Sequence, residues 1–466
     1  MRRYYAGLIT VLFECALLAW PSGARASFDL FSTTNYVASG SFARTSEVCQ
    51  ADRINKPLAL ADVVELALCN NPQTRSLWAS SRAQAAQYGS SLSPYLPTLS
   101  GPISVSTSRN VAGATSTQSS QRSVGVTISY LLLDFGGREA GVENAKQLLV
   151  AANATRDATL QGVYLSAVQA YYTLLSTRAS VQAFRAAEET AGKSLDAAQA
   201  RYKAGSGTPA DRLQAQTALS QAVLNRIRAE GNAASAQGTL ANIMGFDATQ
   251  PFALAAVPES GPDTVAEQGI GKLIEEARRK RPDLLAADAQ IKAAEAQLTA
   301  TRAAGLPTVS LNSTLSRTET LVGGVSSPSH GNILGVSVSV PWFSGYRDTY
   351  NNRAAQAQLE GKIADRDRVA NQIALDVWKA YQTLLTNSQA LRAADDLLVS
   401  AEQSENVASG RYKAGVGNIL DALTAQSALA NARQQRVAAL YDFQASRFAL
   451  AQAMGELDLT LPTTTH

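Results

Sequence analysis

Two stretches of about 65 residues each follow a helical pattern with almost no helix breaker, and they constrain the fold more than any other feature. They run from Arg138 to about Tyr202 and from about Arg347 to Tyr412. A continuous α-helix of this length spans about 100 Å, because each residue adds about 1.5 Å. No compact domain of ordinary size contains such an element. The sequence therefore predicts an elongated molecule.

The chain uses one unit twice. The segment Ala200–Thr208 (Ala-Arg-Tyr-Lys-Ala-Gly-Ser-Gly-Thr) returns 210 residues later as Gly410–Asn418 (Gly-Arg-Tyr-Lys-Ala-Gly-Val-Gly-Asn). In both copies two glycines interrupt a helical pattern and an aspartate follows, Asp211 or Asp421. The same offset relates three further landmarks of the first half to the second: Asn71-Pro72, Leu96-Pro97-Thr98 and Met244-Gly245. The shared offset indicates an internal duplication.

The N-terminus has the layout of a cleaved secretory signal, which we place at residues 1–26. Two arginines precede an apolar run from Leu8 to Trp20, and Ala24-Arg25-Ala26 offers a cleavage site. A single membrane anchor is the alternative, but the run is short and Glu14 interrupts it. Cys15 lacks the preceding small residues of a lipidation site. Export would leave Cys49 and Cys69, either as a disulfide or as two free thiols.

Residues and motifs that could catalyse a reaction or bind a metal or cofactor are scarce. The chain has two histidines, His330 and His466, so no histidine-based metal site or catalytic triad can be assembled. No phosphate-binding loop, nucleophile elbow or dinucleotide motif occurs. The net charge is +3, and basic residues are interleaved with acids. The sequence therefore favours neither an enzyme nor a cofactor, and it offers no face for nucleic acid.

Between the helical stretches, each half contains residues that alternate with period two. Apolar residues at even positions from Val124 to Tyr130 alternate with Ser, Gly and Thr. This pattern predicts a β-hairpin at 98–131, and a similar pattern predicts one at 308–341. Gly- and Ser-rich turn regions are expected at 109–121 and 318–331. One face of each hairpin is apolar and the other carries Ser and Thr.

Strands of about ten residues can cross a bilayer when tilted. Four strands cannot close a barrel, and an open sheet in lipid leaves unpaired backbone groups at its edges. Several chains must therefore pool their strands. The alternative is a soluble protein whose four strands pack on the helices as a small sandwich. Alanines at spacings of three and four let the long helices pack closely, either as an ordinary coiled coil or as a cylinder built by several chains.

These patterns divide the chain into a signal peptide (1–26), an N-terminal extended segment (27–57), a first structural repeat (58–255), a second structural repeat (256–456) and a C-terminal tail (457–466). Each repeat holds helices and one hairpin.

The signal, the two similar halves, the hairpins between helices and the Arg-Tyr-x-x-Gly turns followed by Asp resemble the TolC family of outer-membrane export ducts. The resemblance covers residues 58–456 and is most specific over Arg411–Gly455. It implies a mixed α and β membrane protein in the cell outer membrane. A homotrimer would form a twelve-stranded transmembrane β-barrel, with four strands per chain in outer-membrane lipid, continuous with a long α-helical barrel in the periplasm. It also implies a periplasmic adaptor (membrane fusion) protein and an inner-membrane ABC transporter or proton-driven pump as partners.

The resemblance places the glycine turns at the periplasmic mouth of the tunnel. Tyr412 matches a family tyrosine that hydrogen-bonds between neighbouring coils, with Asp211 as its partner. Asp421 matches an aspartate whose threefold ring narrows the mouth and favours cations. In the alternative interpretation, both aspartates only favour helix N-termini and Tyr412 only packs on a helix. The helix-turn tips are expected to contact the adaptor through Arg201, Tyr202, Gly205, Arg411 and Gly415.

Two positions depart from the family pattern. Gly417 stands where the best-known member has an arginine that ties the coils shut. Thr424 stands where that member has a second ring of aspartates. The resemblance therefore implies a mouth held by fewer polar links and with a weaker preference for cations.

The polar residues of such a tunnel do not identify the cargo that it exports. The absence of a lipidation cysteine favours general or type I protein secretion, and the chain is similar to exporters of large repeat toxins, such as the cyclolysin exporter. An exit duct for multidrug or small-molecule efflux is the alternative. A soluble periplasmic coiled-coil adaptor is the alternative from another class of protein, but it would need neither the strands nor two near-equal halves.

Overall fold

The structure is a computed structural model, and it describes residues 29–37, 56–113, 115–255, 269–323 and 325–457. The predicted signal peptide, Cys49 and most of the predicted C-terminal tail lie outside the described residues.

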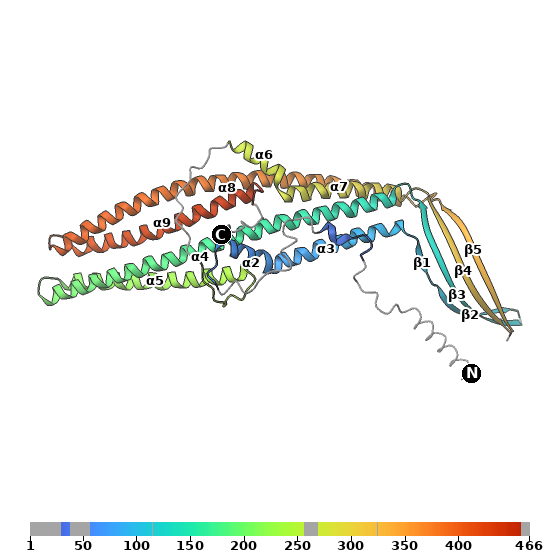
Figure 1. Ribbon diagram of the computed structural model, residues 1–466, viewed down its shortest axis with the longest axis horizontal. Coiled ribbons are helices and arrows are strands. Elements are labelled where there is room, and N and C mark those ends of the chain that lie inside the picture. The colour runs from blue at the N-terminus through green and yellow to red at the C-terminus, as the bar shows by residue number, and fades with distance from the viewer. Residues whose placement is uncertain (1–28, 38–55, 114, 256–268, 324, 458–466) are drawn as a thin grey trace, which may run out of the picture.

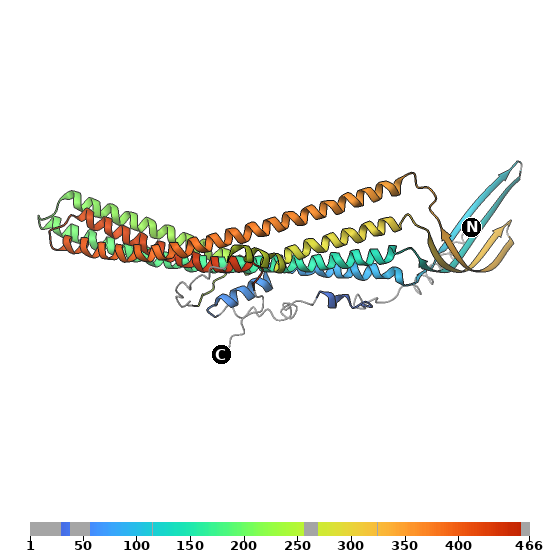
Figure 2. The ribbon, with the colours of Figure 1, turned by 90° about the horizontal axis from the view of Figure 1, so that it is seen from above.

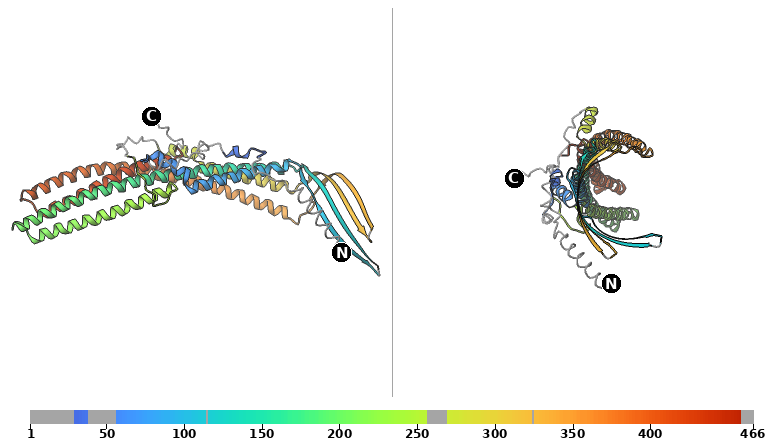
Figure 3. Two further views of the ribbon diagram at one scale, coloured as in Figure 1. Left: turned by 60° about the horizontal axis from the view of Figure 1, so that its bottom comes forward. Right: turned by 90° about the vertical axis from the view of Figure 1, so that its right-hand side faces the viewer.

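The chain forms an elongated wall with a β-sheet at one end and two helical hairpins at the other (Figure 1). Helices α4 (Gly137–Lys203) and α8 (Arg347–Lys413) have 67 residues each. They turn back as α5 (Pro209–Ile243) and α9 (Ile419–Ala453). Seen from one end, the wall is curved (Figure 3). The predicted long helices and elongated shape are confirmed.

Shorter helices complete the half of the wall next to the sheet: α2 (Leu60–Asn70), α3 (Pro72–Leu92), α6 (Ile270–Lys280), α7 (Pro282–Ala303) and the 3-10 turns η1 (Thr33–Tyr36) and η4 (Ser93–Tyr95). Pro72 and Pro282, which are 210 residues apart, each begin a new helix, because proline fits the first turn of a helix but not its interior. The Asn71 side chain caps α3 by accepting from the Gln73 amide over 2.8 Å. Among the described helices, none is both long enough and apolar enough to span a membrane.

The order of helices across the wall is equivalent at both ends, with α3 in the place of α5 and α7 in the place of α9. Near the hairpin tips it is α5, α4, α9, α8 (Figure 1), and near the sheet it is α3, α4, α7, α8 (Figure 2). The end of α5 meets the start of α3, where Asn71 Nδ2 donates to the Ile243 carbonyl over 3.1 Å. The end of α9 likewise meets the start of α7, where Arg281 Nη1 donates to the Ala453 carbonyl over 3.4 Å. Helices α5 and α8 are therefore left at the two edges of the tip half.

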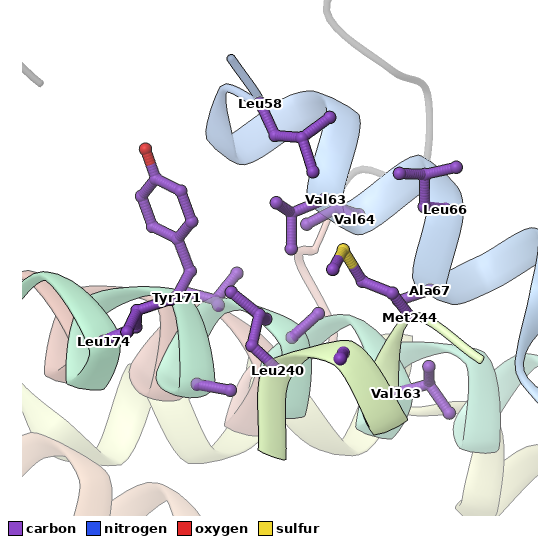
Figure 4. Packing of buried hydrophobic residues seen from close by; sticks show 14 of the residues in the cluster. Leu58, Val63, Val64, Leu66, Ala67, Val163, Tyr171, Leu174, Leu240 and Met244 are labelled. Atoms are coloured by element: carbon purple, nitrogen blue, oxygen red, sulfur yellow. The ribbon is translucent and has the colours of Figure 1, made fainter. Parts of the chain in front are cut away.

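The largest apolar cluster lies at the middle of the wall, where α2 packs on α4 and on the end of α5 (Figure 4). Tyr171 is only 1% exposed there, and burial raises the pKa of its hydroxyl to about 12. Cys69 in α2 is disulfide-bonded. The sequence left open whether Cys49 pairs with it, and Cys49 is among the residues that are not described. The other labelled members of the cluster are Leu58, Val63, Val64, Leu66, Ala67, Val163, Leu174, Leu240 and Met244.

The sheet is antiparallel and contains β1 (Thr98–Ser100), β2 (Ile103–Ala112), β3 (Thr115–Leu133), β4 (Thr308–Val322) and β5 (Val325–Ser339). Strands β1 and β2 pair with the same side of β3, so they form one interrupted strand. The order across the sheet is β1/β2, β3, β4, β5. Each half therefore contributes one hairpin, as predicted.

The prediction of broad turns at 109–121 and 318–331 was wrong, because both segments belong to paired strands. The chain reverses tightly at Gly113 and Gly323, which have φ of +63° and +58°. Hydroxyl groups link the strands, as Ser108 Oγ and Ser119 Oγ do over 2.8 Å. Pro328 fits in β5 because this edge strand pairs on one side only.

The register separates an apolar face of the sheet from a polar face. On the apolar face Ile128 stands between Leu99 and Ser313, and Val126 stands beside Leu315. Beyond these rows, toward the turns, the same face carries Arg122, Arg317 and Glu319. The opposite face is mostly Ser, Thr, Asn and Gly, with hydrogen bonds such as those between the hydroxyls of Thr127 and Thr314 (3.2 Å) and from Ser129 to Asn312 (2.8 Å). The predicted two-sided sheet is confirmed.

Arg156 anchors the N-terminal segment 29–37 to the wall. Its side chain is 3% exposed, and Nη1 donates to the Val37 carbonyl over 2.9 Å. The guanidinium also lies 4.5 Å from the centre of the Trp78 ring and pairs with Asp157 over 2.8 Å. One buried cation thus joins α4, α3 and the segment that precedes α2.

Replacing Arg156 with Ala is expected to lower the free energy of unfolding by about 2–3 kcal/mol, since it leaves the buried Val37 carbonyl without a donor and opens a cavity beside Trp78. Proteolysis should become faster within residues 29–37. The control is Arg366→Ala, which removes half-exposed pairs with Asp288 and Asp367 and should cost less than about 1 kcal/mol. Equal losses for the two variants would show that Arg156 does not anchor the segment.

Candidate functional site

Both helical hairpins reverse direction on a pair of glycines. Gly205 and Gly415 have φ of +74° and +79°, the left-handed conformation that ends many helices. The Ser206 amide then donates to the Arg201 carbonyl over 3.0 Å. In the second hairpin the Val416 amide donates to the Arg411 carbonyl over 3.1 Å. The repeated motif is therefore the same closed turn in both halves.

The second glycine of each turn is held against the helix it leaves. A Cβ at Gly417 would lie 2.9 Å from the Arg411 Cβ, and one at Gly207 would lie 3.1 Å from the Arg201 Cβ. Contacts below about 3 Å force the backbone to move, so this turn favours glycine at position 417. The close packing of this turn thus explains why glycine stands at position 417, although the resemblance would place an arginine there.

Arg201 joins the two tips within the chain. Its Nη2 donates to the Tyr412 carbonyl over 2.7 Å and to the Lys413 carbonyl over 3.2 Å. The guanidinium also lies 4.2 Å from the centre of the Tyr412 ring. The carbonyls of a last helical turn carry negative partial charge, so a cation is favourable there. The repeated motif predicts Arg201 at the tip but not this contact with α8, because the contact joins residues more than 200 positions apart.

Asp211 is part of a capping box at the start of α5. The Thr208 amide donates to Asp211 Oδ2 over 3.0 Å, and the Asp211 amide donates to Thr208 Oγ1 over 3.2 Å. Within the described chain, Asp211 forms no hydrogen bond with Tyr412. Tyr412 instead packs on a small apolar cluster formed by α4, α5 and α9. The geometry therefore accounts for Asp211 as the N3 residue of the capping box, with Thr208 as the N-cap residue.

Asp421 occupies the same position in α9 but has no such role. Asn418 caps this helix by accepting from the Leu420 amide over 3.0 Å. Asp421 is exposed, and its carboxylate has no hydrogen bond or ion pair within the part of the chain that the structure describes. Thr424, one turn later, is exposed as well. The carboxylate of Asp421 therefore remains available to solvent or to ions.

Ion pairs connect the arms of the first hairpin. Arg185 Nη2 lies 2.8 Å from Glu230 Oε1, and Arg226 pairs with both Glu188 and Glu230. Hydrogen bonds from Arg185 and Arg226 lower the pKa of the Glu230 carboxyl. In the second hairpin, Arg436 pairs with Asp395 over 3.1 Å. Because these pairs lie at a partly exposed surface, each adds little to stability.

Within the described ranges, no three His, Cys, Asp or Glu side chains form a group able to hold a metal ion.

Comparison with known proteins identifies the family. The sequence model of the outer membrane efflux protein family matches residues 63–246 and again residues 273–456. The chain belongs to this family. The expected relationship to the TolC family is confirmed, since outer membrane protein TolC of Vibrio cholerae is 24% identical over 85% of this chain and 91% of its own length. Members of this family are outer-membrane channel proteins, not enzymes.

Two further relatives differ in their names. Protein CyaE of Bordetella pertussis is 30% identical over 408 residues, which cover 87% of this chain and 86% of that protein. A probable efflux pump outer membrane protein of Pseudomonas putida, TtgC, is 25% identical over 85% of this chain and 83% of its own length.

Solved structures share the fold. The CmeC outer membrane channel of Campylobacter jejuni superposes with a TM-score of 0.75 at 20% identity, covering 85% of both chains. The MtrE outer membrane channel of Neisseria gonorrhoeae, solved in its open state, gives a TM-score of 0.72 at 21% identity over 85% of this chain and 88% of its own. The combination of long helical hairpins and a strand-bearing end is thus the fold of outer-membrane channels.

Proposed function

We propose that three copies of this chain form the exit duct of a tripartite export machine. Four strands from each copy would close a twelve-stranded transmembrane β-barrel in the outer membrane, and the helices would continue it as an α-helical barrel through the periplasm. Residues 58–255 and 256–456 would be its two structural repeats. The observation that carries the proposal is the sheet itself, which has one apolar face, one polar face and two unpaired edges.

The sheet edges support closure by further copies. Among the described residues, strands β1/β2 and β5 each pair on one side only, and an open edge in lipid leaves backbone groups unsatisfied. Where the sheet joins α8, Trp342 is 91% exposed, and Phe343 and Tyr346 are exposed beside it. Aromatic side chains at this level form the belts that mark a membrane interface. The Ser- and Thr-rich face would then line the lumen.

The helical edges support the same arrangement. Helices α5 and α8 lie at opposite edges of the tip half, and both leave apolar side chains exposed. Examples are Leu213 and Ile227 on α5 and Val399 and Val407 on α8. A head-to-tail contact between two different edges closes a ring when the rotation is right. The curvature of the wall in Figure 3 suits such a ring.

We infer that the cargo is a protein secreted by a type I system, with a periplasmic adaptor at the tips and an inner-membrane ABC transporter behind it. The support is the 30% identity to Protein CyaE and the similarity to cyclolysin exporters. The second candidate is efflux of drugs or other small molecules through a proton-driven pump, which the similarity to TtgC favours.

A deletion strain tests the function. Loss of a protein from the culture medium, restored by a plasmid copy, is expected for type I secretion. Unchanged secretion with raised susceptibility to drugs would favour efflux instead. In parallel, the purified protein should have the mass of a trimer in detergent. Recovery as a soluble periplasmic monomer would contradict the duct altogether.

The Asp421→Ala variant is expected to lower the permeability ratio of cations to anions several-fold and to weaken block by divalent cations, because three carboxylates would leave the mouth of the pore. Single-channel recording in planar bilayers measures both effects. The matched control is Asp211→Ala, which removes one of the two hydrogen bonds of the capping box, worth about 1 kcal/mol, and should leave selectivity unchanged. Equal selectivity in Asp421→Ala and the unmodified protein would remove Asp421 from the pore.

A further inference from the structure

Each copy of the motif that closes the tips contains one arginine, but within the described residues only one of these two side chains has a partner. Arg201 donates to the carbonyls at the end of α8 and lies 4.2 Å from the centre of the Tyr412 ring. Arg411 holds the matching place at the end of α8, 210 residues later. It is exposed, and its guanidinium makes no hydrogen bond, ion pair or ring contact with the described residues.

The surface that receives Arg201 is also duplicated, and its second copy is uncovered. Tyr412 and Leu423 pack on the small apolar cluster formed by α4, α5 and α9. Their matching residues in the first half, Tyr202 and Leu213, are 41% and 58% exposed. The same residue types therefore lie in a contact in the second half and face outward in the first half. An uncovered copy of a contact surface indicates a missing neighbour.

The backbone carbonyls that end α8 and α4 also correspond to each other. The Tyr412 carbonyl accepts from the Gly415 amide over 3.1 Å and, in addition, from Arg201 over 2.7 Å. The Tyr202 carbonyl accepts the matching bond from the Gly205 amide over 3.1 Å but has no side-chain donor within the described chain. A guanidinium, with five N–H donors and a permanent charge, suits such terminal carbonyls.

The order of helices supplies the geometry. Within the chain α4 packs on α9, which brings Arg201 to the end of α8. If the next copy repeats this contact head to tail, α8 meets the partner's α5. Arg411 then approaches the end of the partner's α4, as Arg201 approaches the end of α8.

We propose that Arg411 clasps the partner's Tyr202, donating to the carbonyls that end the partner's α4 and stacking on the tyrosine ring. Arg212 already lies 5.3 Å from the centre of the Tyr202 ring in its own chain, so Arg411 uses the opposite face of the ring. Clasps within chains and clasps between chains alternate around the tip of the duct. They supply a link between copies where Gly417 carries no side chain. This inference rests on the proposed trimer.

Cross-linking of paired cysteines tests the clasp in the full-length protein. Tyr202→Cys combined with Arg411→Cys, treated in detergent with a short bifunctional thiol reagent, is expected to give covalent dimers and trimers on a denaturing gel. The matched pair is Arg201→Cys with Tyr412→Cys, which should give only an internally linked monomer. Tyr202→Cys alone should give neither product, since the native Cys69 is already disulfide-bonded.

The outcomes distinguish failure of the contact between Arg411 and the partner's Tyr202 from failure of the proposed trimer. If the protein has the mass of a trimer and the 201/412 pair links internally, but the 202/411 pair links nothing, the clasp is overturned and the trimer stands. If the 202/411 pair gives internally linked monomer, Arg411 contacts its own chain and the clasp is again overturned. If the protein is a monomer by mass, the proposed duct fails and the clasp fails with it.

Discussion

Replacing Gly245 with Ala is expected to lower the free energy of unfolding by about 3–5 kcal/mol, the largest loss from one methyl group that we predict for the helical part. Gly245 ends α5 with φ of +78°, a conformation that L side chains avoid. A Cβ there would lie 2.6 Å from the Asn70 carbonyl oxygen and 2.7 Å from its carbon. Asn70 cannot yield easily, because α2 ends there and α3 begins two residues later against Ile243. The strain and the clash therefore add.

Two other glycines provide a graded control for this prediction. Gly205 has φ of +74° but nothing within 4 Å of its would-be Cβ, so Gly205→Ala should cost only the backbone strain of about 1–2 kcal/mol. Gly455, at the matching joint of the second half, would place a Cβ 3.1 Å from the Lys280 carbonyl carbon, so its loss should be intermediate. Urea midpoints at one protein concentration in detergent give the order. A loss at Gly205 equal to that at Gly245 would show that the joint is not tightly packed.

The helices could be predicted from the sequence because their boundaries depend on local chemistry. Pro72 and Pro282 cannot continue a helix, and Gly205 and Gly415 suit its left-handed end. The strand ends could not be predicted in the same way. The Ser and Thr residues at 109–121 predicted a loop, but in the sheet such hydroxyls bond across strands on the polar face, as Ser119 does with Ser108.

The candidate site likewise combines features that the sequence predicts with features that it does not predict. Asp211 and Asp421 are indistinguishable by spacing, but their contacts differ because Thr208 forms a reciprocal capping box and Asn418 does not. The contact from Arg201 to Tyr412 depends on which helices are neighbours, and a linear motif does not contain that information. The repeat does show that Arg201 and Arg411 hold matching places, since both arginines belong to the duplicated turn.

The sheet offers the second large effect, which tests its two faces with neighbouring residues. Ile128→Arg places a charge on the apolar face, in the row of Leu99 and Leu334. If this face meets lipid, the variant should lose about 2–4 kcal/mol per copy, because an arginine near the bilayer midplane carries that cost. Little folded protein should then reach the outer membrane, as measured by the share of chains that resist unfolding in detergent before heating.

Thr127→Arg is the control, because Thr127 precedes Ile128 on β3 but faces the polar side, where its hydroxyl lies 3.2 Å from that of Thr314. A charge on that side would lie in a water-filled lumen, so folding should be nearly unchanged while the conductance of the pore falls. Because the two variants add the same side chain one position apart, differences in expression or in strand propensity cannot explain a contrast between them. If Thr127→Arg blocks folding and Ile128→Arg does not, the apolar face lines the lumen, and the proposal assigns the two faces of the sheet to the wrong sides of the barrel. If both fold equally well in membranes, neither face meets lipid, and the sheet must be covered by protein instead.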